Sequence, residues 1–288
     1  MARDSENGSD STKPELTLNY AQDSKNTYPH EVSDLQFYAW FLKHTALHSP
    51  ATLNELRAIP NFFRLISSDI YQGKNIQRLD GETAMTIPGA TAGDWSQALL
   101  RKFINRVGGD AYPSGIACNV FAGTHMLPPL IDRVKRINDS TGMKITLIGH
   151  SLGASLAKLI SDEIPEEVKQ VISMAGVLNS SIGVSKLVLA GLAPAGALNL
   201  SMFGVSVLRE EMDIFHQLDK PVLVPHVSMY SKNDGIITYK SCMRRDTEDY
   251  EIKGASHIDL GMCNKDSFKL VAEIMRRSMP HVRPSKVA

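Results

Sequence analysis

Cysteine is scarce in this chain, and its scarcity excludes one class of protein. Only three of the 288 residues are cysteines, Cys118, Cys242 and Cys263, and no two of them have the C-x-x-C spacing of a metal site. Three cysteines cannot form the disulfide framework of a small secreted domain. We therefore expect buried free thiols, while a bridge between Cys242 and Cys263 stays an open alternative.

An excess of positive charge is also missing. Lys and Arg number 31, Asp and Glu also number 31, and the formal net charge is zero when histidine is neutral. A protein that binds nucleic acid needs a clustered excess of basic side chains, so we predict no nucleic-acid partner. Hydrophobic residues make up 43% of the chain, which is enough for a sizeable core.

The N-terminus has no long hydrophobic run. Residues 1–29 are polar and mixed in charge, without the apolar stretch of a secretory signal. We expect a flexible tail and a cytoplasmic protein. Residues 30–80 then form a helical segment, with helices over 31–47 and 51–71, the second broken at Pro60. The aromatic first helix either packs on the main domain or lies at a membrane or lipid surface.

From residue 81 to residue 288 the pattern is that of one α/β domain. Apolar, strand-like runs alternate with longer, helix-like runs, which predicts a mostly parallel sheet covered by helices on both faces. The expected strands are 82–89, 111–119, 144–150, 167–176, 225–231 and 248–254. The expected helices are 94–108, 127–142, 151–164 and 264–279, with the two prolines of 127–142 in its first turn.

A long insertion at about 177–220 separates two of the expected strands. Residues 187–208 within it carry no charge, and they reach the length of a membrane span. Glycine, proline and asparagine interrupt this run, and strands of the sheet flank it on both sides. The pattern favours a mobile lid over a site on the sheet, against a membrane span or an ordinary excursion of loop and helix.

The sequence Gly149-His150-Ser151-Leu152-Gly153 lies where an apolar strand is followed by a helix. G-x-S-x-G at such a junction is typical of a nucleophile elbow, a tight turn that needs glycine two residues to either side. The turn lifts the serine hydroxyl off the sheet and directs the N-terminus of the next helix at it. We predict that Ser151 is a nucleophile; the alternative is a serine that merely starts a helix.

A serine nucleophile needs a base, and the base needs an acid, in the chain order Ser, Asp or Glu, His. Asp234 follows the strand at 225–231, and only His257 and His281 come later as bases. His257 follows the last expected strand, whereas His281 lies in the C-terminal tail. We therefore predict Asp234 and His257 as the partners of Ser151, with Asp259 a weaker candidate for the acid because it is so close in sequence to His257.

A negative oxygen that forms on a substrate carbonyl needs two donors. The N–H of Leu152 at the start of the helix supplies one, and the loop after the first strand of the domain supplies the other. In that loop Gly89 allows a close backbone approach, so we predict that the N–H of Ala90 is the second donor. A plain strand-to-helix turn is the alternative.

Four motifs in this order resemble the α/β-hydrolase superfamily: Pro88-Gly89, the elbow at 149–153, Ser231 to Ile237, and Ser256-His257. The resemblance covers about residues 82–279, and it is closer to serine esterases and lipases with a Pro-Gly oxyanion loop and a lid before the acid-bearing strand. It implies an α/β-hydrolase fold with Ser151, Asp234 and His257 as the catalytic triad. Two departures are the missing hairpin before the first strand and Ala90, where some lipases have a hydroxyl-bearing residue.

These inferences predict a serine hydrolase that cleaves small carboxylic esters through an acyl-enzyme, without a metal or an organic cofactor. The aromatic helix at 31–47 and the uncharged run at 187–208 indicate a substrate with an apolar acyl group, and they allow contact with a lipid surface. An acyltransferase or a thioesterase would use the same triad, and an inactive hydrolase serving as a binding module is a further alternative. The sequence does not determine the acyl chain length or the oligomeric state.

Overall fold

The computed structural model describes residues 52–120, 123–179 and 217–277. The predicted tail at 1–29, the aromatic helix at 31–47 and most of the insertion at 177–220 lie outside these ranges. No helix within them is both long enough and apolar enough to cross a membrane.

The described strands form one six-stranded sheet in which all neighbours are parallel. The strand order is β2-β1-β3-β4-β5-β6. The strands are β1 (Thr83–Ile87), β2 (Asp110–Pro113), β3 (Ile145–His150), β4 (Val168–Met174), β5 (His226–Tyr230) and β6 (Glu248–Glu251).

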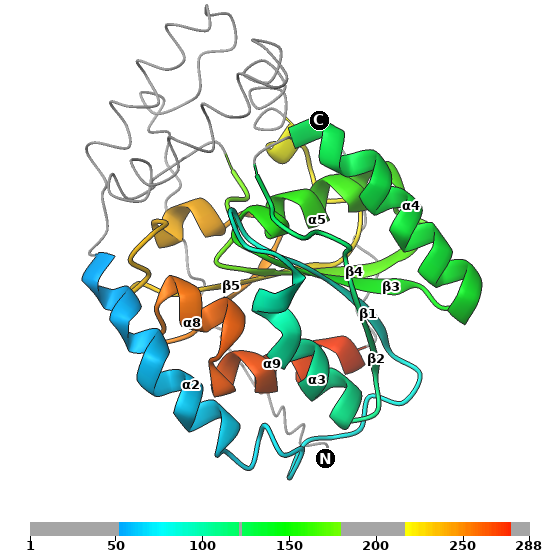
Figure 1. Cartoon of the computed structure of the whole chain (residues 1–288). Helices are drawn as coiled ribbons and strands as arrows, with labels where there is room; N and C mark the ends of the chain where they lie inside the picture. Colours follow the sequence, from blue (N-terminus) through cyan, green and yellow to red (C-terminus); the bar gives the residue numbers. More distant parts are fainter. Residues whose placement is uncertain (1–51, 121–122, 180–216, 278–288) are drawn as a thin grey trace, which may run out of the picture.

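Helices cover both faces of this sheet, which confirms the predicted fold class (Figure 1). One face carries α4 (Gly123–Thr141) and α5 (Leu152–Glu163). The other carries α2 (Ala58–Ile66), α3 (Ala98–Arg106), α8 (His257–Met262) and α9 (Lys265–Arg276). Three short 3-10 helices complete the elements: η1 (Thr52–Arg57), η2 (Asp94–Gln97) and η3 (Tyr239–Cys242).

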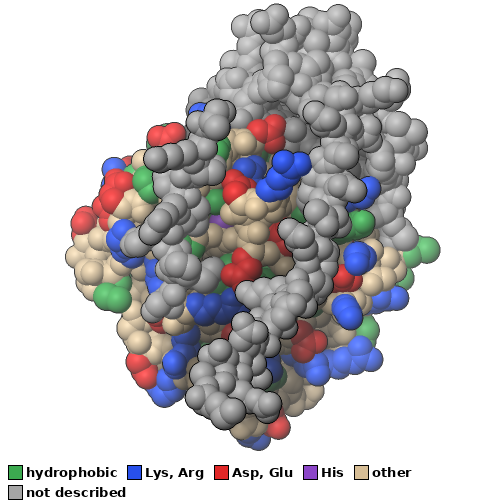
Figure 2. All heavy atoms as spheres, turned by 180° about the vertical axis from the view of Figure 1, so that it is seen from behind, with side chains coloured by type: hydrophobic (Ala, Val, Ile, Leu, Met, Phe, Trp, Pro, Cys, Tyr) green, Lys and Arg blue, Asp and Glu red, His purple; other side chains and the backbone are tan. Residues whose placement is uncertain are grey.

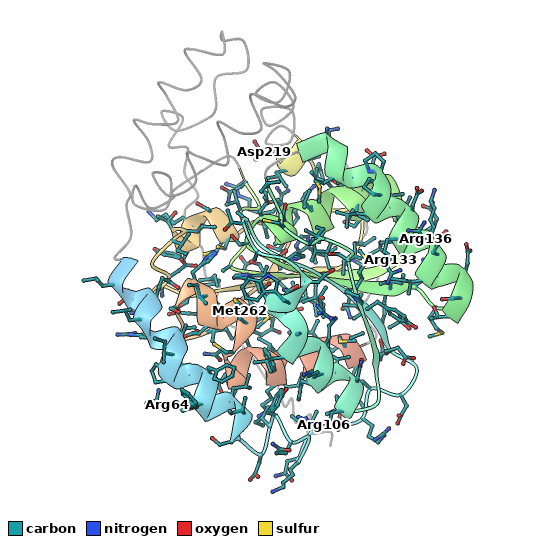
Figure 3. All side chains as sticks on the ribbon, viewed as in Figure 1. Arg64, Arg106, Arg133, Arg136, Asp219 and Met262 are labelled. Carbon is teal, nitrogen blue, oxygen red and sulfur yellow. The ribbon has the colours of Figure 1, made fainter. Side chains whose placement is uncertain are left out.

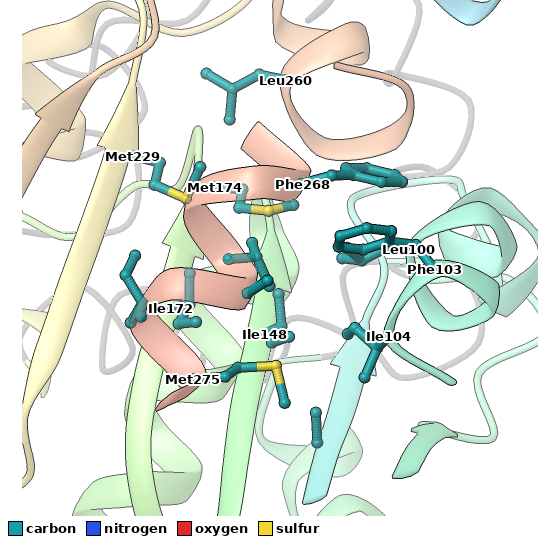
Figure 4. Packing of buried hydrophobic residues seen from close by; sticks show 14 of the residues in the cluster. Leu100, Phe103, Ile104, Ile148, Ile172, Met174, Met229, Leu260, Phe268 and Met275 are labelled. Atoms are coloured by element: carbon teal, nitrogen blue, oxygen red, sulfur yellow. The ribbon is translucent and has the colours of Figure 1, made fainter. Parts of the chain in front are cut away.

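Alternate side chains of the central strands enter two separate cores. Ile145 and Leu147 of β3 pack under α4 and α5, and Ile148 packs on the opposite face. In that second core, Phe103 of α3 lies against Phe268 of α9 (Figure 4). Every residue of β1 and β3 is buried, as expected for parallel strands covered on both faces.

Most charged side chains of the described residues lie on the outside of this assembly, although Lys158, Asp234 and Asp259 are buried. Arg136 points outward from α4, and Arg64 points outward from α2 (Figure 3). Basic and acidic side chains are interspersed over the described part of the face in Figure 2. This distribution follows from the equal numbers of the two signs in the sequence.

Three predicted elements differ from the structure. The strand expected at 111–119 is confined to Asp110–Pro113. Helix α4 begins at Gly123, so Pro128 and Pro129 lie inside it and not in its first turn; each proline removes one helical N–H donor near this end. Helix α2 is not broken at Pro60, which occupies the first turn, where a missing N–H leaves no bond unmade.

All three cysteines are free thiols. Cys242 and Cys263 are buried and do not pair with each other, whereas Cys118 is exposed. The expectation of buried thiols is therefore wrong for Cys118, which lies in the segment that follows the shortened strand β2.

The strand order reverses between β1 and β3. The chain moves from β1 outward to β2, and then returns to add β3 on the other side of β1. Ligands of open α/β sheets bind outside the carboxyl ends of the strands at such a reversal of strand order. The loop after β1 and the turn after β3 are therefore brought together at the expected binding end.

We expect Phe268→Ala to lower the free energy of unfolding by about 3–5 kcal/mol, because it leaves a cavity between α9 and α3. Phe268 is fully buried, with its ring 5.5 Å from that of Phe103 and 6.4 Å from that of Tyr71. Urea unfolding measures the change. The matched control is Phe63→Ala on α2, where the side chain is 61% exposed and the change should stay within about 0.5 kcal/mol. Equal losses in the two variants would contradict the assignment of Phe268 to the core.

Candidate active site

Ser151 occupies a strained turn between β3 and α5. Its backbone has φ 54° and ψ −123°, a combination that residues other than glycine rarely adopt. The N–H of Ser151 donates to the carbonyl of Met174 on β4 at 2.9 Å, which ties the turn to the neighbouring strand. A nucleophile elbow requires this strained conformation, and the structure has it at the position that the motif predicted.

The glycines of the motif are required by contact. A Cβ atom on Gly149 would lie 2.3 Å from the carbonyl oxygen of Gly153. A Cβ on Gly153 would lie 2.2 Å from the carbonyl oxygen of Ile87 on β1. Neither backbone can shift without moving the sheet, so the turn can form only with glycine at both positions.

Asp234 and His257 are in direct contact, although they are 23 residues apart. The Nδ1 atom of His257 lies 2.8 Å from Oδ2 of Asp234, and both side chains are almost completely buried. The other carboxylate oxygen accepts from the N–H groups of Ile236 and Ile237, each at 2.8 Å. The loop after β5 therefore fixes the carboxylate, and the carboxylate fixes the orientation of the imidazole.

His257 is the first residue of helix α8, and not a loop residue as the sequence suggested. Ser256 caps the helix, and its hydroxyl accepts from the N–H of Asp259 at 3.3 Å. Helix α8 was not predicted, since six residues are too few to show a helical period.

The charges around His257 raise its pKa above the ordinary value. Burial by itself lowers the pKa, but the attraction and the hydrogen bond of Asp234 outweigh it, and Glu55 adds a smaller attraction. His257 is therefore a stronger base than a free imidazole, with Nε2 left as the acceptor when Nδ1–H donates to Asp234.

The ring of His150 lies next to that of His257, the predicted base. Its ring centroid is 4.9 Å from that of His257, and its Nε2 atom is 3.0 Å from the backbone carbonyl of His257. A Cβ on Gly261 of α8 would lie 2.1 Å from the same ring. Burial and the neighbouring His257 lower the pKa of His150 to about 3, so the ring is neutral and Nε2–H donates to the carbonyl.

The loop after β1 lies directly against the elbow. A Cβ on Gly89 would be 3.0 Å from Cβ of Ser151, which is tighter than side chains usually pack. Asn119 holds the loop through two hydrogen bonds. Its side-chain amide donates to the carbonyl of Pro88 at 2.8 Å, and its backbone carbonyl accepts from the N–H of Thr91 at 2.6 Å. The sequence analysis did not identify Asn119, because it comes 31 residues after Pro88.

The two predicted oxyanion donors face no competing acceptor in the described part of the chain. Leu152 is the first residue of α5, a position whose N–H has no partner within the helix. The N–H of Ala90 makes no hydrogen bond with the residues that the structure describes. Both groups are therefore free to bind an oxygen of a ligand.

The weaker candidates lie elsewhere. Asp259 accepts from the side-chain amides of Asn61 at 2.5 Å and Asn264 at 3.5 Å, and it makes no bond to the His257 ring. His281 lies outside the described residues.

One acidic residue at the site was not predicted. Glu55 of η1 accepts backbone hydrogen bonds from Gly235, next to Asp234, and from His257 and Ile258. It lies 180 residues or more before its partners, and no local sequence signal indicates such a contact.

Comparison with known proteins gives a family-model match and similar solved structures. Residues 122–256 match the family model described as putative esterase. No curated protein matches the chain. A soluble variant of monoglyceride lipase from Saccharomyces cerevisiae, solved with a substrate analogue, is similar at 14% identity and a TM-score of 0.50, covering 69% of this chain and 86% of that one. At this identity, the similarity shows the fold.

Two further structures are similar over the same part of the chain. The monoacylglycerol lipase of Paleococcus ferrophilus has 14% identity and a TM-score of 0.47, and it covers 69% of this chain and 96% of that one. A putative aryl esterase from Burkholderia cenocepacia has 12% identity and a TM-score of 0.48, with 70% and 92% covered.

The burial of His150 predicts a loss of stability in acid. The pKa of its imidazole is about 3 in the folded protein, and an unfolded histidine titrates near 6.5, so the unfolded chain binds more protons between these values. The contribution of neutral His150 is complete above about pH 6.5 and is lost as the pH falls toward about 3. His150→Gln should therefore reduce the slope of unfolding free energy against pH by about 1.4 kcal/mol per unit between about pH 4 and 5.

Urea unfolding over a pH series measures this slope. His226→Gln is the matched comparison, because burial also lowers the pKa of His226 to about 3, but this residue lies in the sheet, bonded to Ser173. Each variant should flatten the profile by one proton. A slope in His150→Gln equal to that of the wild type would mean that His150 titrates normally.

Proposed function

From the α/β-hydrolase fold that this chain has, we propose that the protein is a serine hydrolase of carboxylic esters, of the esterase or lipase type. One observation carries the proposal: the buried Asp234–His257 pair lies beside the strained turn that presents Ser151. The match of residues 122–256 to the putative esterase model supports the same reaction class.

The first half of the reaction forms an acyl-enzyme. Nε2 of His257 takes the proton of the Ser151 hydroxyl while Oγ attacks the ester carbonyl carbon. The carbonyl oxygen becomes negative and binds the N–H groups of Ala90 and Leu152. When the tetrahedral intermediate collapses, the ester C–O bond breaks and the leaving alcohol takes the proton from His257.

The second half releases the acid product. Water gives a proton to Nε2 of His257 and attacks the acyl carbon. The bond between that carbon and Oγ of Ser151 then breaks, and Oγ takes the proton back from His257 as the acid leaves. Asp234 remains ionised throughout and stabilises the imidazolium that forms twice in each turnover. Every step uses side chains and backbone groups of this chain.

The nature of the substrate and the surroundings of the site belong to the same proposal. In the sequence, the uncharged stretch at 187–208 comes after β4 and before β5. A lid at this position would offer an apolar wall to the acyl group of a small-molecule ester, and it would allow contact with a lipid surface. We further propose that the reaction takes place in the cytoplasm.

Ser151→Ala should lower kcat for p-nitrophenyl ester hydrolysis by several orders of magnitude, because the variant has no oxygen to accept the acyl group. The measurement compares acetate through palmitate esters with wild type and variant side by side, and the chain-length optimum sizes the acyl pocket. A fluorophosphonate should label the wild type and leave the variant unlabelled.

The control for this experiment is Ser155→Ala on the next turn of α5, where the hydroxyl donates to the carbonyl of Val177. This variant should keep its labelling. A wild type that is neither labelled nor active on any ester would overturn the proposal. Addition of alcohol or thiol acceptors in the same assay detects acyl transfer, and acyl-CoA turnover detects a thioesterase.

The raised pKa of His257 sets the acidic limit of activity. The reaction needs neutral His257, so kcat/KM should decrease as the pH falls through the pKa of His257, which lies above the ordinary value of about 6.5.

Asp234→Asn should lower kcat by about 10⁴-fold, because an amide cannot hold the imidazole in the required tautomer or stabilise its charge. A pH profile of the wild type and initial rates of the variant measure both effects. An Asp234→Asn variant with wild-type activity would mean that another group orients His257.

A further inference from the structure

The carboxylate of Glu55 joins the two loops that carry the proposed acid and base. Its Oε1 atom accepts from the N–H of Gly235 at 2.9 Å and from the N–H of His257 at 3.0 Å. Its Oε2 atom accepts from the N–H of Ile258 at 2.8 Å. Gly235 is the residue after Asp234, so one half-buried side chain holds both members of the pair through their backbones.

These three bonds define the separation of the two loops. The Asp234 loop follows β5 and His257 begins α8, with η3 and β6 between them along the chain. The N–H groups of His257 and Ile258 belong to the first turn of α8, where no helical carbonyl can accept from them. A carboxylate at this end of a helix satisfies the donors and complements the helix dipole.

The rest of the N-terminal segment holds α8 at other points. The Asn61 amide donates to Asp259, and the Cys263 thiol donates to the carbonyl of Ala58 at 3.5 Å. The Arg57 guanidinium donates to the carbonyl of Gly254 at 3.4 Å. These bonds attach α8 to η1 and α2, but among them only those of Glu55 reach the loop of Asp234 as well.

We propose that Glu55 is a positioning residue for the hydrolase reaction, a carboxylate that fixes the Asp234 loop and the His257 backbone in register with each other. The proposal rests on the proposed function for its catalytic meaning. Glu55 touches backbone groups of the acid and base loops, and it acts through them.

Charge gives a readout that separates positioning from simple folding. The titratable groups that face His257 are Asp234 from the loop after β5, Glu55 from η1 and neutral His150 from β3. Glu55 raises the pKa of His257, so removal of its charge lowers that pKa. The acidic limb of the activity profile then moves to lower pH, because His257 becomes neutral at a lower pH.

The experiment compares Glu55→Gln and Glu55→Asp with the wild type. In Glu55→Gln, one oxygen becomes an NH2 group that faces backbone N–H donors, so kcat should fall about 10- to 100-fold, the cost of misplacing a reacting group by about 1 Å. Its acidic limb should also move to lower pH. Glu55→Asp keeps the charge and shortens the reach, so its kcat should fall while the limb stays near that of the wild type.

The matched control is Glu82→Gln. The Glu82 carboxylate is also partly buried and bonds Lys169 at 2.6 Å, at the opposite end of the sheet from the elbow. This variant should lose stability in urea without a change in kcat or in the acidic limb. If Glu55→Gln keeps both wild-type values, or changes only in stability as Glu82→Gln does, the positioning role is wrong. If Glu55→Gln does not fold, a wild-type kcat in Glu55→Asp overturns the proposal and a reduced kcat supports it.

An NMR titration of the His257 ring keeps this result independent of the proposed function. A wild type that neither turns over esters nor reacts with a fluorophosphonate would overturn the hydrolase proposal. In that case a lower His257 pKa in Glu55→Gln would still support the contact between Glu55 and the His257 loop, and an unchanged pKa would overturn it. If the wild type is active and labelled, and the Glu55 variants keep its kcat and acidic limb, only the positioning role is overturned.

Discussion

The structure depends on the close approach of three backbones at the carboxyl end of the sheet. The start of α5 lies against the end of β1 so tightly that Gly153 has no room for a methyl group, and Gly89 has hardly more beside Ser151. This contact fixes the strained conformation of Ser151, and neighbouring β4 holds its N–H. The strained conformation of Ser151 costs free energy, and it persists because the packing around the turn allows no other backbone conformation.

Around this turn, buried polar groups are arranged so that few of them carry charge. His150 is buried beside the base, yet its low pKa keeps it neutral, and its Nε2–H donates to the carbonyl of His257. A charged ring at this place would oppose the imidazolium that forms on His257 during the proposed reaction. The Asp234–His257 pair therefore has no charged imidazole next to it. Backbone hydrogen bonds hold the two loops that carry the pair.

The sequence predicted the parallel sheet well because its strands are short apolar runs between helix-like segments. It predicted the ends of elements less well. The prolines of α4 suggested a first turn and Pro60 suggested a break, but Pro128 and Pro129 lie inside α4 and Pro60 lies in the first turn of α2. Helix α8 was missed because it is one and a half turns long and owes its position to contacts with η1 and α2.

The sequence by itself determined the elbow, since glycine at 149 and 153 around a serine between a strand and a helix has one common structural solution. It also predicted Asp234 and His257 as the partners of Ser151, because both follow parallel strands, whose carboxyl ends meet at one edge of the sheet. Only the tertiary structure decided which groups hold them: Glu55 for the two loops, Asn119 for the loop of Ala90, and His150 under His257. Each of these contacts joins residues far apart in the chain, and no local pattern encodes a contact that exists only after the sheet and its helices have packed.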